Sequence, residues 1–158
     1  MDRIDRAILR ELQRNGRISV VELAAKVNLT KTPCSDRMRR LEAAGVIKRY
    51  GAELDPVALE ANHVVLVQVV LRGTTADELE RFNEAVRRVP EIQSCHMIAG
   101  DFDYLLKVRT RDIQHYRRLL GDTISRLPHV QQTHTYVVME TVKDDMTLPV
   151  PPGPMPVG

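Results

Sequence analysis

The chain has 158 residues, 43% of them hydrophobic, and its 23 lysines and arginines against 21 aspartates and glutamates leave a formal net charge of +2. This composition predicts a globular protein of one domain or two small ones, and no apolar run approaches the roughly 20 residues that span a bilayer. The charged first residues are unlike a signal peptide, and the only cysteines are Cys34 and Cys95. We therefore expect a cytoplasmic protein without a disulfide scaffold or a thiolate zinc site.

The charge is divided unevenly along the chain. Residues 1–50 carry 12 basic and 6 acidic side chains, whereas residues 51–158 carry 11 and 15, so the two parts stand at +6 and −4. Parts of opposite sign indicate two domains with different partners, and a compact basic module is typical of proteins that bind a polyanion. An ordinary solvated basic surface has the same charge and stays open as an alternative.

Three stretches of the basic part have apolar residues at helical spacing. They predict helices over residues 2–15, 19–28 and 30–44. The second has Ser19 as its N-cap and Glu22 three residues later, which is the spacing of a capping box. Only a few residues separate the second helix from the third, as in a helix-turn-helix.

The third predicted helix has two unlike faces. At 100° per residue, Cys34, Met38 and Leu41 share a face that packs, whereas the opposite face is polar and mostly basic. In a helix-turn-helix such a face enters the major groove, where hydroxyl and arginine side chains reach base edges or phosphates. A short strand over residues 46–51 is expected as a wing that meets phosphates. The candidate DNA-binding residues are Lys31, Thr32, Ser35, Arg37, Arg39, Arg40, Lys48 and Arg49.

Two features of this part keep alternatives open. Asp36 lies on the outward face, where it disfavours nonspecific phosphate binding and either accepts from a cytosine amine or holds Arg39 and Arg40 in place. Cys34 is expected as a small core residue rather than a redox switch. A helical bundle with a solvated basic face fits the same pattern.

The second part alternates strands and helices after a linker over residues 51–61. The pattern predicts strands over residues 63–71, 92–99, 104–110 and 130–140, and helices over 76–89 and 113–127. The order β-α-β-β-α-β is the ferredoxin-like arrangement, an α+β fold with both helices on one face of a four-stranded antiparallel sheet. Because the first strand is apolar on both faces, we expect a second copy of the chain to cover the other face.

The chain ends in a proline-rich segment. Residues 147–158 contain five of the nine prolines and no charged side chain, so we expect residues 144–158 to be a disordered tail. A partner that reads polyproline II helices is an alternative role for this tail.

Several motifs together resemble the Lrp/AsnC family, the leucine-responsive or feast/famine regulators, and are nearest its leucine-responsive branch. They are Asp2-Arg3-Ile4-Asp5, Gly16-Arg17-Ile18-Ser19, Leu29-Thr30-Lys31-Thr32-Pro33-Cys34, Arg39-Arg40-Leu41-Glu42, Gly45-Val46-Ile47, Gly100-Asp101-Phe102-Asp103-Tyr104-Leu105-Leu106-Lys107 and Tyr136-Val137-Val138-Met139-Glu140. The resemblance implies a transcription factor that controls genes of amino-acid metabolism. It would have a winged helix-turn-helix over residues 1–50 and an effector-binding and oligomerisation domain over 62–143, and its dimers would assemble into larger rings, often octamers.

The resemblance also implies a site for an amino-acid effector between dimers. The candidate effector-binding residues are Met97, Gly100, Asp101, Asp103, Ile113, Tyr136, Val137 and Val138. Turn amides can receive a carboxylate, an aspartate can receive an ammonium, and apolar side chains can surround an aliphatic group. Gly100 and the two aspartates are also ordinary turn-forming residues. Leucine is the first expectation, and other apolar amino acids, including proline, stay open.

Enzyme chemistry is poorly supported by the sequence. The best acid/base candidates are Asp101 and Asp103 near His96, but neither a nucleophile nor a phosphate-binding loop accompanies them. The five histidines form no close pair of metal ligands, so we expect neither a metal nor a cofactor besides the effector. The competing functions are an architectural protein that wraps DNA without an effector response, and an amino-acid-binding module that has lost DNA binding.

Overall fold

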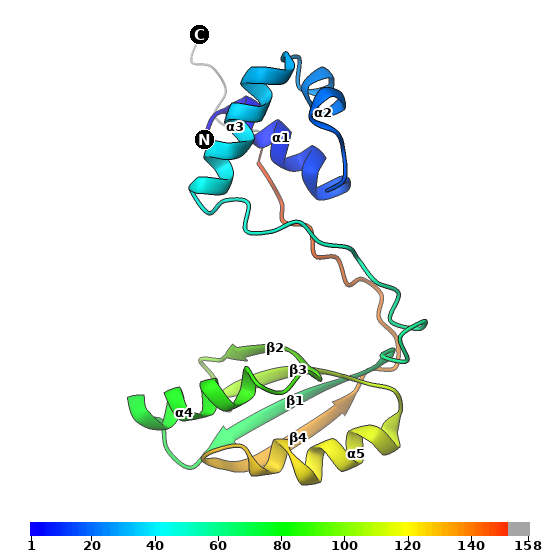
Figure 1. Ribbon diagram of the computed structural model, residues 1–158. Coiled ribbons are helices and arrows are strands. Elements are labelled where there is room, and N and C mark those ends of the chain that lie inside the picture. Colours follow the sequence, from blue (N-terminus) through cyan, green and yellow to red (C-terminus); the bar gives the residue numbers. More distant parts are fainter. Residues whose placement is uncertain (152–158) are drawn as a thin grey trace. The chain divides into compact units, whose positions relative to one another are not determined.

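The computed structural model describes residues 1–151, which belong to two compact units (Figure 1). The first unit contains residues 1–53 together with the described residues from Asp144 onward, and the second contains Leu54–Lys143. The chain thus leaves the first unit, forms the second and returns. No helix in the described part of the chain is long and apolar enough to cross a membrane.

The first unit is built from three helices around a small core. The helices are α1 (Arg3–Arg14), α2 (Val20–Lys26) and α3 (Lys31–Ala43). The sequence predicted each of them to within about two residues at either end. Their core consists of the fully or nearly fully buried side chains Ile8, Leu23, Ala24, Val27, Cys34 and Leu41.

Local hydrogen bonds explain where these helices begin and end. The Ser19 hydroxyl and the Glu22 carboxylate form the expected capping box at the start of α2. The turn between α2 and α3 contains Asn28 at φ 56°, a left-handed conformation that asparagine tolerates better than most residues. After α3 the chain reverses at Gly45, whose φ of 68° favours glycine at this position after a helix.

Residues 46–51 form no strand, and the prediction of a short strand there is wrong. The apolar side chains of this segment do face the core at one position, since Ile47 packs against the core of the first unit. No strand of that unit lies beside it to complete a hydrogen-bonded ladder, and the four strands of the described chain all belong to the second unit. Instead the Tyr50 hydroxyl donates to the Glu42 carboxylate at 2.8 Å.

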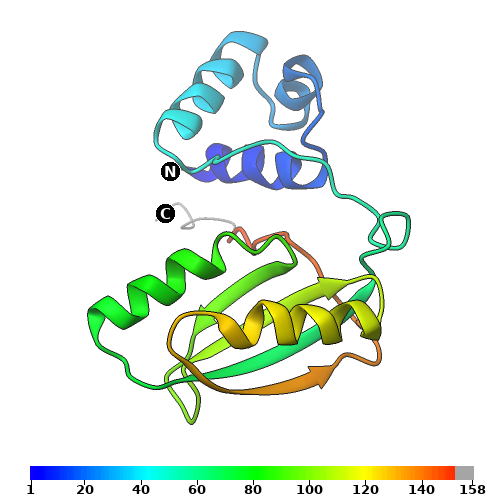
Figure 2. The ribbon, with the colours of Figure 1, turned by 60° about the horizontal axis from the view of Figure 1, so that its bottom comes forward.

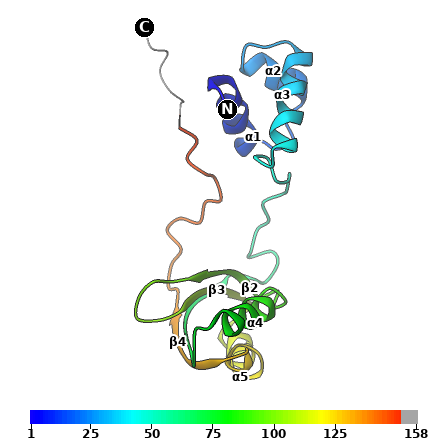
Figure 3. The same ribbon diagram turned by 90° about the vertical axis from the view of Figure 1, so that its left-hand side faces the viewer.

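The second unit is a four-stranded antiparallel sheet with two helices on one face (Figures 2 and 3). Its elements are β1 (His63–Leu71), α4 (Ala76–Val86), β2 (Ile92–Met97), β3 (Tyr104–Thr110), α5 (Ile113–Asp122), a 3-10 turn η1 (Ile124–Arg126) and β4 (Val130–Val137). The strand order is β2-β3-β1-β4, which is the predicted ferredoxin-like arrangement. β1 and β3 have the predicted bounds, whereas α4, β2, α5 and β4 end earlier than expected.

The core of this unit lies between the sheet and the two helices. Alternate residues of β1 (Val65, Val67 and Val69) are fully buried there, and the rings of Phe82 and Tyr104 pack with their centroids 4.5 Å apart. Leu66, Gln68 and Val70 lie on the opposite face and are only partly buried, as are their neighbours on β3. This second face has no helix of the unit on it (Figure 2).

The described end of the predicted tail, residues 144–151, contains no helix or strand, and the expectation of a disordered tail over residues 144–158 stays a prediction. Residues 148–151 follow a defined course along α1, because three side chains of that helix donate hydrogen bonds to their carbonyl groups. The two prolines in this stretch hold it extended and leave those carbonyls without internal partners. The rest of the predicted tail, residues 152–158, lies outside the described residues.

Candidate DNA-binding face and effector site

The outward face of α3 presents four of the eight candidate DNA-binding residues together. Lys31 and Thr32 are exposed in the first turn, and Ser35 is half-buried one turn later. Arg39 lies a further turn along, with 76% of its side chain exposed. Its guanidinium is 3.7 Å from the carboxylate of the equally outward Asp36, so this aspartate orients Arg39 at the surface.

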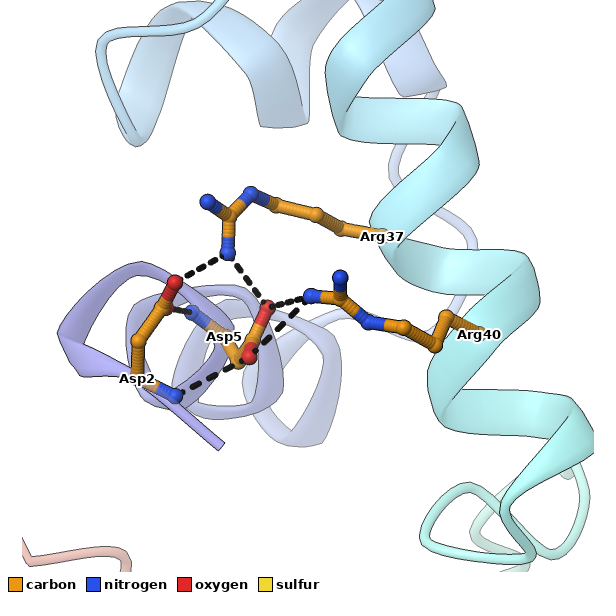
Figure 4. A network of polar contacts seen from close by, with 4 residues as sticks. All are labelled: Asp2, Asp5, Arg37 and Arg40. Atoms are coloured by element: carbon orange, nitrogen blue, oxygen red, sulfur yellow. Dashed lines mark hydrogen bonds and ion pairs between the residues drawn. The ribbon is translucent and has the colours of Figure 1, made fainter.

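The two remaining arginines of α3 face α1 instead (Figure 4). Arg37 donates through Nη1 to the carboxylate of Asp2 and, at 2.8 Å, to Oδ1 of Asp5. Arg40 donates through Nη2 to the same Oδ1 at 3.2 Å. We call these four residues the Asp5 network. It joins the N-terminal end of α1 to the middle of α3 and thereby holds the candidate recognition helix in place.

Electrostatics favour the charged form of the Asp5 network. Desolvation raises the pKa of Asp5, which is only 3% exposed, but hydrogen bonds from the Asp2 amide and the Arg37 guanidinium outweigh it and hold the pKa below its ordinary value. The pKa of Asp2 is lowered by the Asp5 amide and by Arg37. Hydrogen bonds to both carboxylates in turn raise the pKa of Arg37.

Sequence reasoning did not find the acidic half of this network. Asp2 and Asp5 have the spacing of a helix cap, and they do form a capping box at the start of α1. Nothing in the local pattern shows that the same carboxylates also receive arginines 32 to 35 positions away. The only local signal that could have pointed to these carboxylates is their spacing of three at the start of the first helix.

The segment after α3 presents Lys48 and Arg49 as exposed side chains. Next to them Tyr50 is anchored on Glu42, and burial, followed by the hydrogen bond to Glu42, raises the pKa of Tyr50 to about 12. The phenol therefore stays protonated and keeps donating at physiological pH. The two basic side chains are thus carried by a segment that is fixed at both sides, by Ile47 in the core and by Tyr50.

Cys34 is a core residue, as expected. It is fully buried in the first unit, and burial raises the pKa of its thiol. A protonated and inaccessible thiol is a poor nucleophile, so the geometry does not support a redox switch at this position.

The candidate effector residues fall into two groups in the second unit. The first group, formed by Met97, Gly100, Asp101 and Asp103, lies at the end of β2 and in the turn that leads to β3. The second group, formed by Ile113, Tyr136, Val137 and Val138, lies at the start of α5 and at the end of β4. Met97, Ile113, Tyr136 and Val137 all have large exposed apolar side chains.

The sheet places these two groups at diagonally opposite corners. Met97 pairs with Tyr104, which pairs with Val69, whereas Val137 pairs with Val65. Four residues of β1 therefore separate the two levels, a distance of about 13 Å along the strand. β2 and β4 are the two edges of the sheet, so three strand spacings, about 14 Å, separate the groups in the other direction. A single copy of this unit does not bring the two groups together.

Asp103 has a structural role in the turn. Its carboxylate accepts from the Leu71 amide at 2.7 Å, its own amide donates to the Val69 carbonyl, and its carbonyl accepts from Ile98. These bonds tie the turn to the end of β1. Asp101 is exposed in the same turn, where it is the better placed of the two carboxylates to meet a ligand ammonium.

Among the described residues there is no group of three or more histidine, cysteine, aspartate or glutamate side chains that could hold a metal ion. His96, the proposed neighbour of Asp101 and Asp103, lies on β2 in register with Leu105.

Both units match families of known proteins. Residues 1–48 match the family described as winged helix-turn-helix DNA-binding, and residues 64–148 match the Lrp/AsnC ligand binding domain. The two matches define a class of protein that joins a DNA-binding module to a small-molecule-binding module. The chain belongs to the Lrp/AsnC family, whose members among its relatives are transcriptional regulators and not enzymes.

Individual relatives agree with this assignment over nearly the whole chain. The leucine-responsive regulatory proteins of Klebsiella pneumoniae and Escherichia coli (strain K12) are each 53% identical over 148 residues, which is 94% of this chain and 90% of theirs. An AsnC family transcriptional regulator from Agrobacterium tumefaciens is 37% identical with a TM-score of 0.90, and covers 94% of this chain and 97% of its own. A transcriptional regulator from Neisseria meningitidis, solved in complex with L-Met, is 34% identical with a TM-score of 0.89, and covers 94% of this chain and 96% of its own.

Proposed function

We propose that this regulator reads double-stranded DNA with the outward face of α3, and that Lys31, Thr32, Ser35 and Arg39 are the side chains that enter the major groove. The observation that carries this proposal is that Thr32, Ser35 and Arg39 lie together on the outward face of α3. The opposite face of this helix is buried in the core of the first unit, so the outward face is held in place and can be presented to DNA. Lys48 and Arg49 would meet phosphates beside it. Arg40, with 64% of its side chain exposed, would contact DNA while Asp5 positions it, and Arg37 would act mainly as a positioning residue.

The test of this face is the affinity of an Arg39→Ala variant for DNA. The preferred site is first selected from random duplexes, and binding is then measured by fluorescence anisotropy at fixed salt. Because a good arginine contact to a base is worth about 1–3 kcal/mol, we expect affinity to fall roughly 5- to 150-fold. Arg14→Ala, which removes an exposed arginine of α1, is the matched control. Equal affinities for the three proteins would contradict the placement of the face.

We also propose that the second unit binds an aliphatic amino acid, and leucine is the first candidate. Two observations support it: the relatives that are 53% identical are named leucine-responsive, and the Neisseria neighbour holds L-Met. The exposed apolar side chains at both corners of the sheet suit an aliphatic group, and the exposed Asp101 suits an ammonium. The controlled genes would then be those of amino-acid metabolism.

We further infer a homodimer that pairs through the sheet face without helices, assembles to a larger ring such as an octamer, and acts on DNA in the cytoplasm. The partly apolar second face of β1 and β3 supports the pairing. Pairing also supplies two copies of α3, as a two-half-site DNA target requires.

A thermal-shift screen against the twenty amino acids separates this function from its alternative. A ligand that binds only the native state, present at 100 times its Kd, adds about 2.7 kcal/mol to the free energy of unfolding. We therefore expect leucine or another aliphatic amino acid to raise the melting temperature. The alternative is an architectural DNA-wrapping protein, which would bind DNA without selectivity and respond to none of the twenty, with or without DNA present.

A further inference from the structure

The last described residues of the chain lie antiparallel to α1 and are held through their main chain. Arg6 donates through Nη1 to the Pro151 carbonyl at 3.3 Å, and Arg10 donates to the Val150 carbonyl at 3.5 Å. Gln13 makes two bonds with Leu148: its Nε2 donates to the carbonyl at 3.1 Å, and its Oε1 accepts from the amide at 2.7 Å.

The spacing of these donors matches the spacing of the carbonyls. Arg6, Arg10 and Gln13 follow one another at i, i+4 and i+7, so they share one face of α1 and span about 10 Å of its axis. The prolines at positions 149 and 151 hold their own φ angles and push the residues before them into extended conformations. The three residue steps from Leu148 to Pro151 in a polyproline II segment span about 9 Å, so the three donors can reach the carbonyls of residues 148, 150 and 151.

The contact depends little on the side chains of the segment. The Leu148 side chain is 72% exposed, and a proline has no amide to donate. Polyproline II segments leave their carbonyls without internal partners, so these carbonyls are free to accept from a neighbouring helix. The segment also walls a groove of about 440 Å³, whose other side is formed by Leu9, Leu12 and residues 46–51.

We propose that Arg6, Arg10 and Gln13 form a binding site on α1 for a polyproline II-type segment, and that residues 148–151 of the same chain occupy it. The chain is then fastened to its DNA-binding unit on both sides of the ligand-binding unit, by residues before Leu54 and by this segment. A free peptide with so few contacts would bind weakly. Attachment to the same chain makes the encounter intramolecular, which favours occupation of the site over binding of a free peptide.

The decisive measurement is the exchange rate of the Leu148 amide hydrogen, followed by NMR in the full chain and in a Gln13→Ala variant. Gln13 is exposed, so the variant is expected to fold, and it removes both bonds to Leu148. The Leu148 amide should exchange severalfold more slowly than in an unstructured peptide, and this protection should disappear in Gln13→Ala. Arg14→Ala, one residue along α1, is the matched control and should leave the protection intact.

A second comparison keeps the proposal testable if Gln13→Ala is unstable. A chain that ends at Pro151 should keep the NMR shift of the Gln13 side-chain amide, whereas a chain that ends at Met146 should lose it. Leu148→Ala should also keep that shift, because the main chain is what α1 binds. Loss of the shift in Leu148→Ala, or an unprotected Leu148 amide in the unmodified chain, would overturn the proposal. So would protection that falls on dilution, since the occupant would then come from a second copy.

Discussion

Asp5 illustrates how one side chain connects local helix formation to the position of a recognition helix. Its carboxylate accepts from the Asp2 amide, which completes the cap of α1, and from two arginines of α3. Since the carboxylate is almost fully buried, loss of the arginines would leave an unpaired charge there. The capping box therefore works as the anchor of α3 as well.

An Asp5→Asn variant tests this anchor. The substitution keeps the size of the side chain but removes its charge, so we expect the free energy of unfolding at neutral pH to fall by about 1.5–3 kcal/mol, the contribution of a hydrogen bond to a charged group. Urea unfolding followed by far-UV circular dichroism measures it. Asp36→Asn, which alters an exposed pair at 3.7 Å, is the control and should change stability little.

The pH dependence of stability should follow the same residue. The pKa of Asp5 is lowered in the folded state relative to its ordinary value of 3.8, so its contribution is fully present above about pH 4 and is lost as the pH falls through the folded pKa. Asp5→Asn should therefore flatten the acid side of the stability curve below about pH 4. A variant curve parallel to that of the unmodified protein would contradict the assigned role.

At the scale of elements, α2 depends on its cap because it has only seven residues. A helix this short is not stable by propensity alone. The Ser19 hydroxyl accepts from the Glu22 amide at 3.2 Å, and the Glu22 carboxylate accepts from the Ser19 amide at 3.1 Å. Both bonds satisfy donors that the first turn of the helix leaves unpaired.

Removal of this cap should weaken the whole first unit. We expect Ser19→Ala to lower the free energy of unfolding by about 1 kcal/mol, as measured by urea unfolding. Thr30→Ala is the matched control, because Thr30 is the N-cap of α3 but its side chain makes no capping hydrogen bond. Equal losses from the two substitutions would mean that the hydroxyl at position 19 does not act as a cap.

The elements that the sequence predicted well are those with a strong local period. β1 and β3 were found at their observed bounds because β-branched and apolar residues run through both, and a turn or helix follows each. β4 was expected to reach residue 140 but ends at Val137, which pairs with Val65 near the start of β1. β1 continues for two more residues, and the Val138 amide still donates to the Val64 carbonyl, but the regular ladder stops there and no local pattern reports this end.

Contacts between distant parts of the chain were the ones that the sequence could not supply. The candidate residues on the outward face of α3 followed from helical periodicity, but the turning of Arg37 and Arg40 toward Asp5 did not. Likewise, composition gave no sign of the bonds between Gln13 and Leu148, which join residues 135 positions apart. The spacing of apolar residues within a helix or strand does not depend on which distant residues it later contacts. Sequence periodicity therefore carries no information about these long-range contacts.

At the scale of the whole molecule, the two groups of candidate effector residues lie too far apart in one copy of the chain to form a single site. Within one sheet they lie at opposite corners, separated by about 13 Å along the strands and about 14 Å across them. An amino acid is too small to touch both. If the two groups form one site, each site therefore takes one corner from one copy and the opposite corner from another, as in a head-to-tail contact around a ring.

Mixing two inactive variants tests this arrangement. Asp101→Ala alters the exposed carboxylate at one corner, and Ile113→Asp places a charge on the 47% exposed apolar residue at the other, where the start of α5 tolerates an acid. We expect each variant alone to lose binding of L-leucine in equilibrium dialysis while its circular dichroism stays unchanged. When the two variants are co-expressed in equal amounts, about one site in four should regain binding. Each site takes its two corners from two copies, and under random mixing each corner is intact in half of the cases. If the site lay within a single chain, co-expression would restore nothing, and the shared site would be ruled out.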